Sequence, residues 1–352
     1  MLYLLFLLQI NLNMKKFSVI SAFLCLSVML FSQNPEQKES PVKWMSFEEA
    51  LNKQKETPKT ILIDMYTDWC GWCKKMDAAT FSNQDLANYI NTNFYPVKFN
   101  AERKDTIEYN GKTYVNKNIG NRSSHELAQF LMNGRMSYPT IVYIDYENNV
   151  NPVPGFMDVK TIEPLLIYFT ERINKNCNYA DFKQDFINTY YPDSTSKTDG
   201  NINWLDFNDA MTQMKQNPKK LMLFISSDFT NGSKIMLASS LRHPVISDYI
   251  NTNFYATNIR YNTTDTLKVN EYVFINEKKS ANYPHQLVIS LLQPEIKLPS
   301  IVFFDNELNV IFALKGYFPP VVLERYLDFI AKDLYKTGED WQKFNNEFNS
   351  KL

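Results

Sequence analysis

Glycine is scarce in this sequence, with 9 residues among 352. None of them lies in a G-x-G-x-x-G or G-x-x-x-x-G-K-[ST] pattern, so the backbone loops that cradle nucleotide phosphates are missing. Rossmann-type and P-loop functions are therefore excluded, and we expect no cofactor. Histidine and cysteine are also few, with 3 and 4 residues. A closed zinc site would need ligands that converge from distant positions, so we expect no metal.

An excess of charge of either sign is also lacking. The 37 Lys and Arg residues balance 38 Asp and Glu residues, and the pI is about 6.4. A protein that binds nucleic acid needs a basic surface to replace the counterions around the phosphates. We therefore expect no nucleic-acid partner.

The N-terminus carries a long apolar run. Lys15 and Lys16 are the only charges in residues 1–32, and the apolar residues 17–31 follow them. This pattern is typical of a secretory signal peptide, and the run is shorter than the ~20 residues of a membrane-spanning helix. We interpret residues 1–32 as a signal peptide that starts at Met14 and exports the protein to the periplasm or beyond. Membrane contact is then expected only through this segment, if it stays uncleaved.

The sequence repeats itself at an offset of 160 residues. Residues 89–95 and 249–255 both read Tyr-Ile-Asn-Thr-Asn-Phe-Tyr. The same offset aligns further positions without a gap: Trp44 with Trp204, Phe47 with Phe207, His125 with His285, Pro139 with Pro299 and Asp145 with Asp305. A unit of this length is long enough to bury its own core, unlike a solenoid repeat. We therefore interpret the chain as a tandem duplication of one domain.

Helix and strand patterns alternate within each copy, which predicts an α/β order. In the first copy we expect a helix from the Ser46 cap to about residue 56, strands at 60–66, 94–100 and 140–146, a hairpin at 107–114, and helices at 84–92, from Ser124, at 159–173 and at 179–190. The expected domain organisation is a linker at 33–43, a first domain at 44–175, a helix and polar linker at 176–203, a second domain at 204–335 and a C-terminal helix or tail at 336–352.

The number and spacing of the cysteines indicate a reactive pair and not a set of structural disulfides. An exported chain that uses cysteines structurally usually has several bridges, whereas this one has a single close pair, Cys70 and Cys73. The pair follows a buried strand and opens a helix, whose positive end favours a thiolate at Cys70. Cys70 would attack a substrate disulfide, and Cys73, one helical turn away, would resolve the mixed disulfide. Cys177 has no counterpart in the second copy. It is a buried thiol, a link between two copies of the chain or an accidental thiol, and we favour a role without chemistry.

This segment resembles the thioredoxin family. Residues 61–64 and 69–74, which read Ile-Leu-Ile-Asp and Trp-Cys-Gly-Trp-Cys-Lys, match the strand and active-site motif of that family, and Tyr138-Pro139-Thr140 matches its cis-proline segment. The resemblance implies an α/β fold of two tandem thioredoxin-like domains, each with a central mixed β-sheet flanked by helices. It is strong over residues 44–175 and extends to 204–335 mainly through the repeat.

Two charged residues gain a role from the same resemblance. Asp64 matches a buried aspartate that moves a proton for the inner cysteine, and Lys98 matches a strand lysine that often lies nearby. Independently, a carboxylate inside an apolar strand is desolvated, which raises its pKa and makes it a usable acid–base group near neutral pH. The alternative is that Asp64 lies at an edge of the sheet and is solvated.

Aromatic residues next to the cysteines predict a surface that binds substrate. Trp69 and Trp72 flank the thiols as an apolar rim. In the thioredoxin family the segment before the cis-proline pairs with a bound peptide, which implies that Tyr138 and Pro139 belong to the same surface. Trp72 replaces the proline common in thioredoxins, so the direction of electron flow cannot be transferred. Because no histidine separates the cysteines, we do not expect a strong oxidant.

The second copy has lost the redox residues together. Thr230, Ser233, Phe224 and Asn258 stand where the first copy has Cys70, Cys73, Asp64 and Lys98. We therefore expect the second copy to be redox-inactive. It keeps Pro299, which serves either peptide binding or a turn. His125 and His285 occur in both copies at expected helix starts, which indicates packing or capping and not catalysis.

Together these patterns favour an exported thiol–disulfide oxidoreductase, either a reductase or an isomerase, that acts on cysteine-containing proteins. A reductase would need a membrane or periplasmic thiol electron donor, and the second domain would bind substrate or a partner. The alternative hypothesis is a non-catalytic envelope binding or assembly protein in which Cys70–Cys73 is a structural disulfide.

Overall fold

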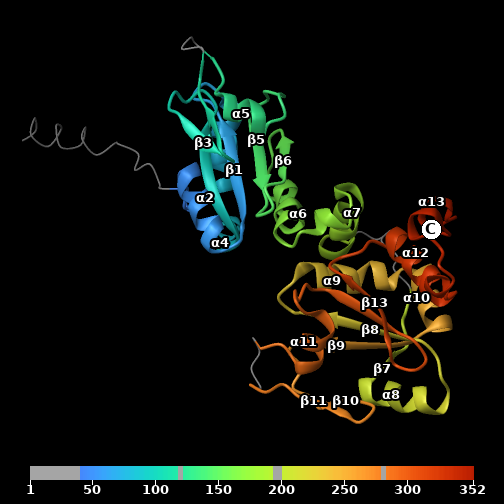
Figure 1. Ribbon diagram of the computed structural model, residues 1–352. Helices are drawn as coiled ribbons and strands as arrows, with labels where there is room; N and C mark the ends of the chain where they lie inside the picture. Colours follow the sequence, from blue (N-terminus) through green and yellow to red (C-terminus); the bar gives the residue numbers. More distant parts are fainter. Residues whose placement is uncertain (1–39, 118–121, 193–199, 279–282) are drawn as a thin grey trace, which may run out of the picture. The chain divides into compact units, whose positions relative to one another are not determined.

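The computed structural model describes residues 40–117, 122–192, 200–278 and 283–352. The expected signal peptide, most of the linker at 33–43 and most of the polar linker before residue 200 lie outside the described residues. Two mixed β-sheets with flanking helices, together with two separate two-stranded hairpins, make up the described part, which confirms the expected α/β fold class (Figure 1). We call residues 41–170 the first region, residues 171–190 the connector and residues 200–352 the second region.

The first region follows the expected alternation of helices and strands. Its elements are α2 (Phe47–Glu56), β1 (Thr60–Tyr66), α3 (Gly71–Met76), the π-helix η1 (Asp77–Phe81), α4 (Gln84–Asn93), β2 (Phe94–Asn100), β3 (Ile107–Tyr109), β4 (Lys112–Tyr114), α5 (Glu126–Leu131), β5 (Thr140–Ile144), β6 (Val150–Pro154) and α6 (Val159–Thr170). The sheet order is β2-β1-β5-β6, with β1 parallel to β2 and the other pairs antiparallel. The central strand β1 is buried almost throughout because helices cover both faces of the sheet.

Local side-chain chemistry explains where several elements begin. The Ser46 hydroxyl accepts a hydrogen bond from the Glu49 amide at 3.0 Å and caps α2, as the sequence predicts. The imidazole of His125 accepts from the Leu127 amide at 3.1 Å and caps α5. His285 caps α11 (Gln286–Leu292) in the same way, so both histidines have capping, one of the two roles expected for them.

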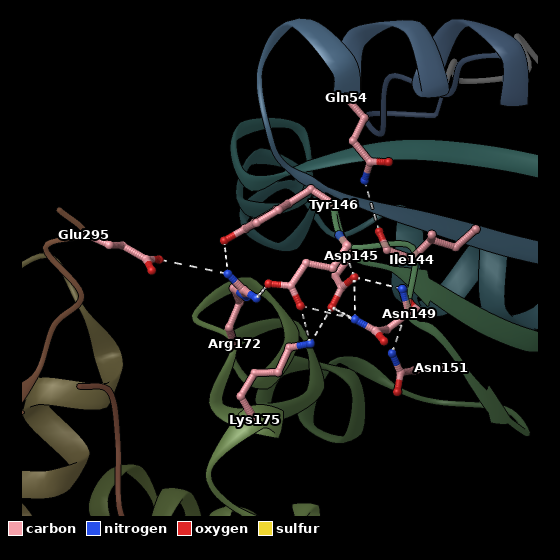
Figure 2. Close-up of polar contacts among 10 residues, drawn as sticks. Gln54, Ile144, Asp145, Tyr146, Asn149, Asn151, Arg172, Lys175 and Glu295 are labelled. Atoms are coloured by element: carbon pink, nitrogen blue, oxygen red, sulfur yellow. Dashed lines mark hydrogen bonds and ion pairs between the residues drawn. The ribbon is translucent and has the colours of Figure 1, made fainter. Parts of the chain in front are cut away.

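Two boundaries differ from the sequence-based expectation. The strand expected to reach residue 146 ends at Ile144, because the Asp145 carboxylate accepts from the amides of Glu147 and Asn149 and closes a turn (Figure 2). The helix expected to run to residue 173 ends at Thr170. Arg172 has a left-handed backbone with φ 54°, which breaks the helix without the glycine that usually marks such a position.

The connector and the second region contain the remaining elements. These are the 3₁₀-helix η2 (Ile173–Lys175), α7 (Tyr179–Tyr190), β7 (Trp204–Leu205), α8 (Phe207–Gln216), β8 (Leu221–Ser226), α9 (Asn231–Ala238), η3 (Ser240–Arg242), α10 (Pro244–Asn253), β9 (Tyr255–Arg260), β10 (Leu267–Val269), β11 (Tyr272–Phe274), α11, β12 (Ser300–Phe304), β13 (Val310–Lys315), α12 (Pro320–Ala331), η4 (Leu334–Lys336) and α13 (Trp341–Glu347). The sheet order is β13-β12-β8-β9-β7, with β8 parallel to β9. Its core strands repeat the arrangement of the first sheet.

Apolar side chains form three buried clusters. One cluster lies in the first region and includes Phe47 and Phe99, and a second lies in the second region and includes Leu223 and Val302. The third contains residues of both regions together with Phe182 and other residues of the connector. The connector is therefore part of the hydrophobic core. Among the described residues, no helix has the length and apolar character needed to cross a membrane.

Candidate functional site

Cys70 and Cys73 form a disulfide at the start of α3. Strand β1 leads into this helix, and Cys70 is its N-cap residue, with a sulfur that accepts a hydrogen bond from the Cys73 amide at 3.0 Å. Both cysteines are buried, with 5% and 3% of their surface exposed, whereas Trp72 between them is 56% exposed. The sequence prediction of a close cysteine pair between a buried strand and a helix agrees with this geometry.

Aromatic side chains lie beside the disulfide. Trp69 is 50% exposed, and its ring makes an edge-to-face contact with Tyr138 at 6.0 Å. Trp72 packs near Phe156, at 5.5 Å between ring centroids. The Tyr138–Pro139 peptide bond is cis, as the resemblance implied. The candidate substrate-binding residues thus form an apolar surface next to the cysteines.

The rim carries cations as well as aromatic rings. The ammonium of Lys75 lies 4.6 Å from the centre of the Trp72 ring, and the guanidinium of Arg122 lies 4.8 Å from that of Trp69. The Trp69 indole also donates a hydrogen bond to Glu102 at 2.9 Å. These contacts hold the two exposed rings in place, because each ring has a charged partner.

Asp64 lies in the middle of β1, with its partner Lys98 directly opposite on β2. The Lys98 ammonium is 3.4 Å from one Asp64 oxygen, and the other oxygen is buried without a hydrogen-bond partner. Burial raises the pKa of Asp64 to about 6, although the positive charge of Lys98 opposes this shift. Asp64 is 1% exposed, which rules out the solvated-edge alternative. Its carboxylate can therefore exchange a proton near neutral pH, whereas its role in turnover stays a prediction.

Asp77 is a third charged residue of this site, and it is not among the residues predicted from the sequence. It is the first residue of the π-helix that continues α3, and its carboxylate forms an ion pair with Lys98. The Lys98 ammonium also lies 5.2 Å from the centre of the Trp44 ring. The negative charge of Asp77 contributes to the raised pKa of Asp64. The repeat offers a sign of this role, because the second copy, which lacks the redox residues, has Leu237 at the position of Asp77.

Replacing Asp77 with asparagine should lower the pKa of Asp64 below about 6. The substitution removes a nearby negative charge and leaves Lys98 with Asp64 as its remaining carboxylate partner. An NMR titration of the Asp64 carboxyl carbon in the oxidised protein measures the shift. Asp68→Asn is the matched control, because the exposed Asp68 pairs with Asn100 and should leave the titration unchanged. An unaltered Asp64 titration in Asp77→Asn would show that Asp77 has no electrostatic effect.

The second region has hydroxyl groups where the first has sulfurs. The hydroxyls of Thr230 and Ser233 lie 2.6 Å apart, and Phe224 replaces Asp64 in the buried strand. Hydroxyl groups form no disulfide, so this region has no dithiol chemistry of its own. The free cysteine of the described residues, Cys177, is buried in the connector, and burial raises the pKa of its thiol to about 12. Among the described residues, no cluster of three or more His, Cys, Asp or Glu side chains could hold a metal ion.

Part of the chain is similar to proteins of known name. Residues 32–180 match the family model Thioredox_DsbH, which is described as a protein of unknown function, DUF255. The disulfide bond reductase DsbH of Chlamydia pneumoniae is 24% identical over 116 residues, which cover 33% of this chain and 63% of that protein. Spermatogenesis-associated protein 20 of Rattus norvegicus is 27% identical over 81 residues, which cover 23% of this chain and 10% of that protein. The chain thus spans a tenth of the length of the rat protein.

Solved structures show similarities of the same kind. The structure described as DsbH oxidoreductase has 22% sequence identity and a TM-score of 0.24, with 33% of this chain and 74% of that chain covered. A thioredoxin from Thermus thermophilus has 14% identity and a TM-score of 0.30, with 39% of this chain and 93% of that chain covered. The mixed α/β fold agrees with the expected fold class, and residues 32–180 are similar to a family model named for DsbH and, in part, to a protein named a disulfide bond reductase.

Proposed function

We propose that the protein is an exported thiol–disulfide oxidoreductase, a reductase or isomerase of protein disulfides, which uses the dithiol of Cys70 and Cys73. The main support for the proposal is the Cys70–Cys73 pair at the start of α3, the helix that follows the strand of Asp64. Exposed aromatic side chains lie next to this pair. The relative from Chlamydia pneumoniae is named a disulfide bond reductase, which supports the direction of electron flow.

The reaction proceeds in two exchange steps. The Cys70 thiolate attacks one sulfur of a substrate disulfide, so a Cys70–substrate bond forms and the other substrate sulfur leaves as a thiolate that takes up a proton. The Cys73 thiolate then attacks the Cys70 sulfur and releases the second substrate thiol. Two electrons have passed to the substrate, and Cys70–Cys73 is oxidised. A dithiol donor in the membrane or the periplasm restores the reduced pair by the reverse exchange.

Proton movement at Cys73 is the proposed role of Asp64. A carboxyl group with a pKa of about 6 is mostly ionised at pH 7 and can accept the thiol proton as Cys73 becomes a nucleophile. Lys98 keeps the ionised form within reach by pairing with it at 3.4 Å. The unpartnered oxygen of Asp64 is free to take part in the transfer.

Substrate binding is proposed at Trp69, Trp72, Tyr138 and Pro139. We expect Trp72→Ala to raise KM for a protein disulfide about tenfold with a smaller change in kcat, because the side chain is 56% exposed and supplies binding area. Phe229→Ala is the matched control, since this 67% exposed ring is the repeat counterpart of Trp69 in the thiol-free copy. Steady-state kinetics on insulin measure both variants, and an equal effect of the two would contradict the assignment.

The experiment that tests the proposed function is insulin reduction by the purified protein with dithiothreitol as donor. A rate well above that of dithiothreitol alone supports a reductase, and reactivation of scrambled ribonuclease separates isomerase from reductase activity. Sequencing the N-terminus of the protein recovered from cells tests export, because cleavage near residue 32 would leave a mature chain outside the cytoplasm.

The alternative function, a non-catalytic binding or assembly protein of the envelope, is favoured by one surface feature. On hairpin β10–β11, Tyr272 and Val273 are 71% and 57% exposed. The first copy has Lys112 and Thr113 at these positions, so only the second copy presents an apolar hairpin. A Cys70–Cys73 disulfide that resists reduction in the native protein would favour this alternative.

A further inference from the structure

The second region has a face that corresponds to the redox face of the first, and the chain itself covers it. Glu171, directly after α6, directs its carboxylate at the start of α9. One carboxylate oxygen accepts from the Asn231 amide and the other from the Gly232 amide, both at 2.7 Å. These amides belong to the first turn of α9, a helix of eight residues. The N–H groups of a first turn have no hydrogen-bond partners within the helix, and this end of the helix is positively polarised. A carboxylate therefore occupies the helix end at which the first region carries its disulfide.

Side chains of the connector fill this face so closely that two of its glycines leave no room for a Cβ atom. A Cβ atom at Gly232 would lie 2.9 Å from the Glu171 carboxylate and 3.2 Å from the Pro299 ring. A Cβ atom at Gly316 would lie 2.7 Å from the Asn176 amide nitrogen. The Gly316 amide donates a hydrogen bond to the Pro299 carbonyl, as the Gly155 amide does to the Pro139 carbonyl in the first region. A Cβ atom at Gly155, however, would meet nothing within 4 Å. The same face is thus filled in one region and open in the other.

Helix α7 of the connector adds polar and aromatic contacts to this face. The Tyr190 hydroxyl donates to the Asn231 side chain at 2.8 Å, and the Tyr317 hydroxyl is hydrogen-bonded to the Asp185 carboxylate. The Phe182 ring meets the Tyr317 ring edge to face at 5.5 Å. Tyr317 follows Gly316 directly and is 1% exposed, so the connector buries it. The contact therefore combines a charged anchor with apolar packing.

On its other side the connector is tied to the first region. Lys175 forms an ion pair with Asp145 at 3.1 Å (Figure 2). Lys175 also pairs with Glu147 at 2.8 Å, and Arg172 pairs with Glu147 as well. Glu171 bonds amides of the second region, whereas its neighbour Arg172 pairs with Glu147 of the first region and also lies 4.0 Å from Glu295 of the second region. The connector is therefore held from both regions through three neighbouring charged side chains, Glu171, Arg172 and Lys175.

We propose that the face of the second region that surrounds Pro299 is a binding site for the chain's own connector, residues 171–190, with the Glu171 carboxylate as its anionic ligand. The helix end that carries the disulfide in the first region is thus an internal docking surface in the second. A substrate peptide has no access to Pro299 while the connector is bound, so any partner of the second region binds elsewhere on it. This inference does not depend on the proposed redox function.

Cys177 provides a native reporter for the test. It lies in the connector, is 7% exposed and belongs to the same apolar cluster as Phe182 and Tyr317. The full chain, with Cys25 replaced by serine and the Cys70–Cys73 disulfide oxidised, is incubated with N-ethylmaleimide, and modification of Cys177 is followed by mass spectrometry. The labelling rate measures how often the connector opens.

Two variants should release the connector. Glu171→Ala removes the ligand, and Gly232→Leu places a side chain where the carboxylate and Pro299 lie. We expect each to raise the labelling rate of Cys177 about tenfold or more, since two charge-assisted hydrogen bonds are lost. Glu163→Ala is the matched control, because this glutamate bonds the exposed Tyr191 hydroxyl and should leave the rate unchanged.

The proposal is overturned if both variants keep the wild-type circular dichroism spectrum and the wild-type labelling rate, or if Glu163→Ala accelerates labelling equally. Should Gly232→Leu not fold, Glu171→Ala decides alone, because Glu171 is only partly buried. No redox turnover occurs in this assay. Failure of the connector proposal and failure of the proposed oxidoreductase function are therefore separate results.

Discussion

Replacing Cys70 with serine is expected to reduce the rate of insulin reduction at least about a thousandfold, to that of dithiothreitol alone. A serine hydroxyl is not ionised at neutral pH and forms no bond to a substrate sulfur, so the first exchange step cannot occur. The measurement is the turbidity of insulin B chain as its disulfides are reduced. Cys177→Ser is the matched control, and it should retain wild-type activity because Cys177 is a buried thiol with a pKa raised to about 12.

Cys73→Ser should fail at the second step instead of the first. Cys70 still attacks the substrate, but no inner thiol releases it, so a covalent Cys70–substrate adduct accumulates. Non-reducing electrophoresis and mass spectrometry detect this adduct. Substantial turnover in Cys70→Ser, or the absence of an adduct in Cys73→Ser, would contradict the assigned order of attack.

Asp64→Asn is expected to slow turnover and to stabilise the protein at the same time. Loss of the group that accepts the Cys73 proton should lower the rate of insulin reduction at pH 7 about ten- to hundredfold. The opposite effect on stability follows from burial, because an ionised carboxylate at 1% exposure is costly to the folded state. An asparagine amide has no charge to bury.

The pH window of the stability effect follows from the two pKa values of Asp64. Folding raises its pKa from 3.8 to about 6, so the folded state binds the proton more tightly than the unfolded state does. The contribution of Asp64 to stability is fully present below pH 3.8 and is lost as the pH rises through about 6. A difference of about two pKa units corresponds to roughly 3 kcal/mol. Above pH 7, the free energy of unfolding of Asp64→Asn should therefore exceed that of the wild type by up to roughly 3 kcal/mol.

Urea unfolding of both proteins at pH 4 and pH 8 measures this difference. A second carboxyl group, Asp185, also has its pKa raised to about 6 by burial. Because Asp185 is present in both proteins, its contribution cancels in the comparison. A variant that is equally destabilised at both pH values would show that Asp64 is structural and not a strained acid–base group.

Much of the central site can be predicted from the sequence because its parts are local. The apolar run around Asp64 predicts a buried strand, and the adjacent Cys70-Gly71-Trp72-Cys73 segment predicts a helix start. The position of Lys98 opposite Asp64 depends on strand register, which the resemblance to thioredoxins supplied and the structure reproduces. Comparison of the two copies is informative as well. Residues that occur in both copies serve the fold that the copies share, whereas the redox residues occur in the first copy alone.

Other parts depend on contacts that no local pattern contains. Asp77 reaches Lys98 because α3 continues as a π-helix, and helical periodicity does not reveal such a change. Glu171 lies in a pattern that reads as helix to residue 173, and its partners at Asn231 and Gly232 are about 60 residues away in sequence. Only the folded chain brings these groups together.

Equilibration of Cys70–Cys73 with glutathione redox buffers decides whether the pair is a redox-active dithiol. The purified native protein is equilibrated at a series of ratios of reduced to oxidised glutathione, and the two thiols are trapped and counted by mass spectrometry. We expect full, reversible equilibration with a reduction potential closer to the roughly -270 mV of thioredoxin than to the roughly -120 mV of a strong oxidant. A disulfide that does not exchange with glutathione while the protein remains folded would contradict the proposed function and leave Cys70–Cys73 as a structural bridge.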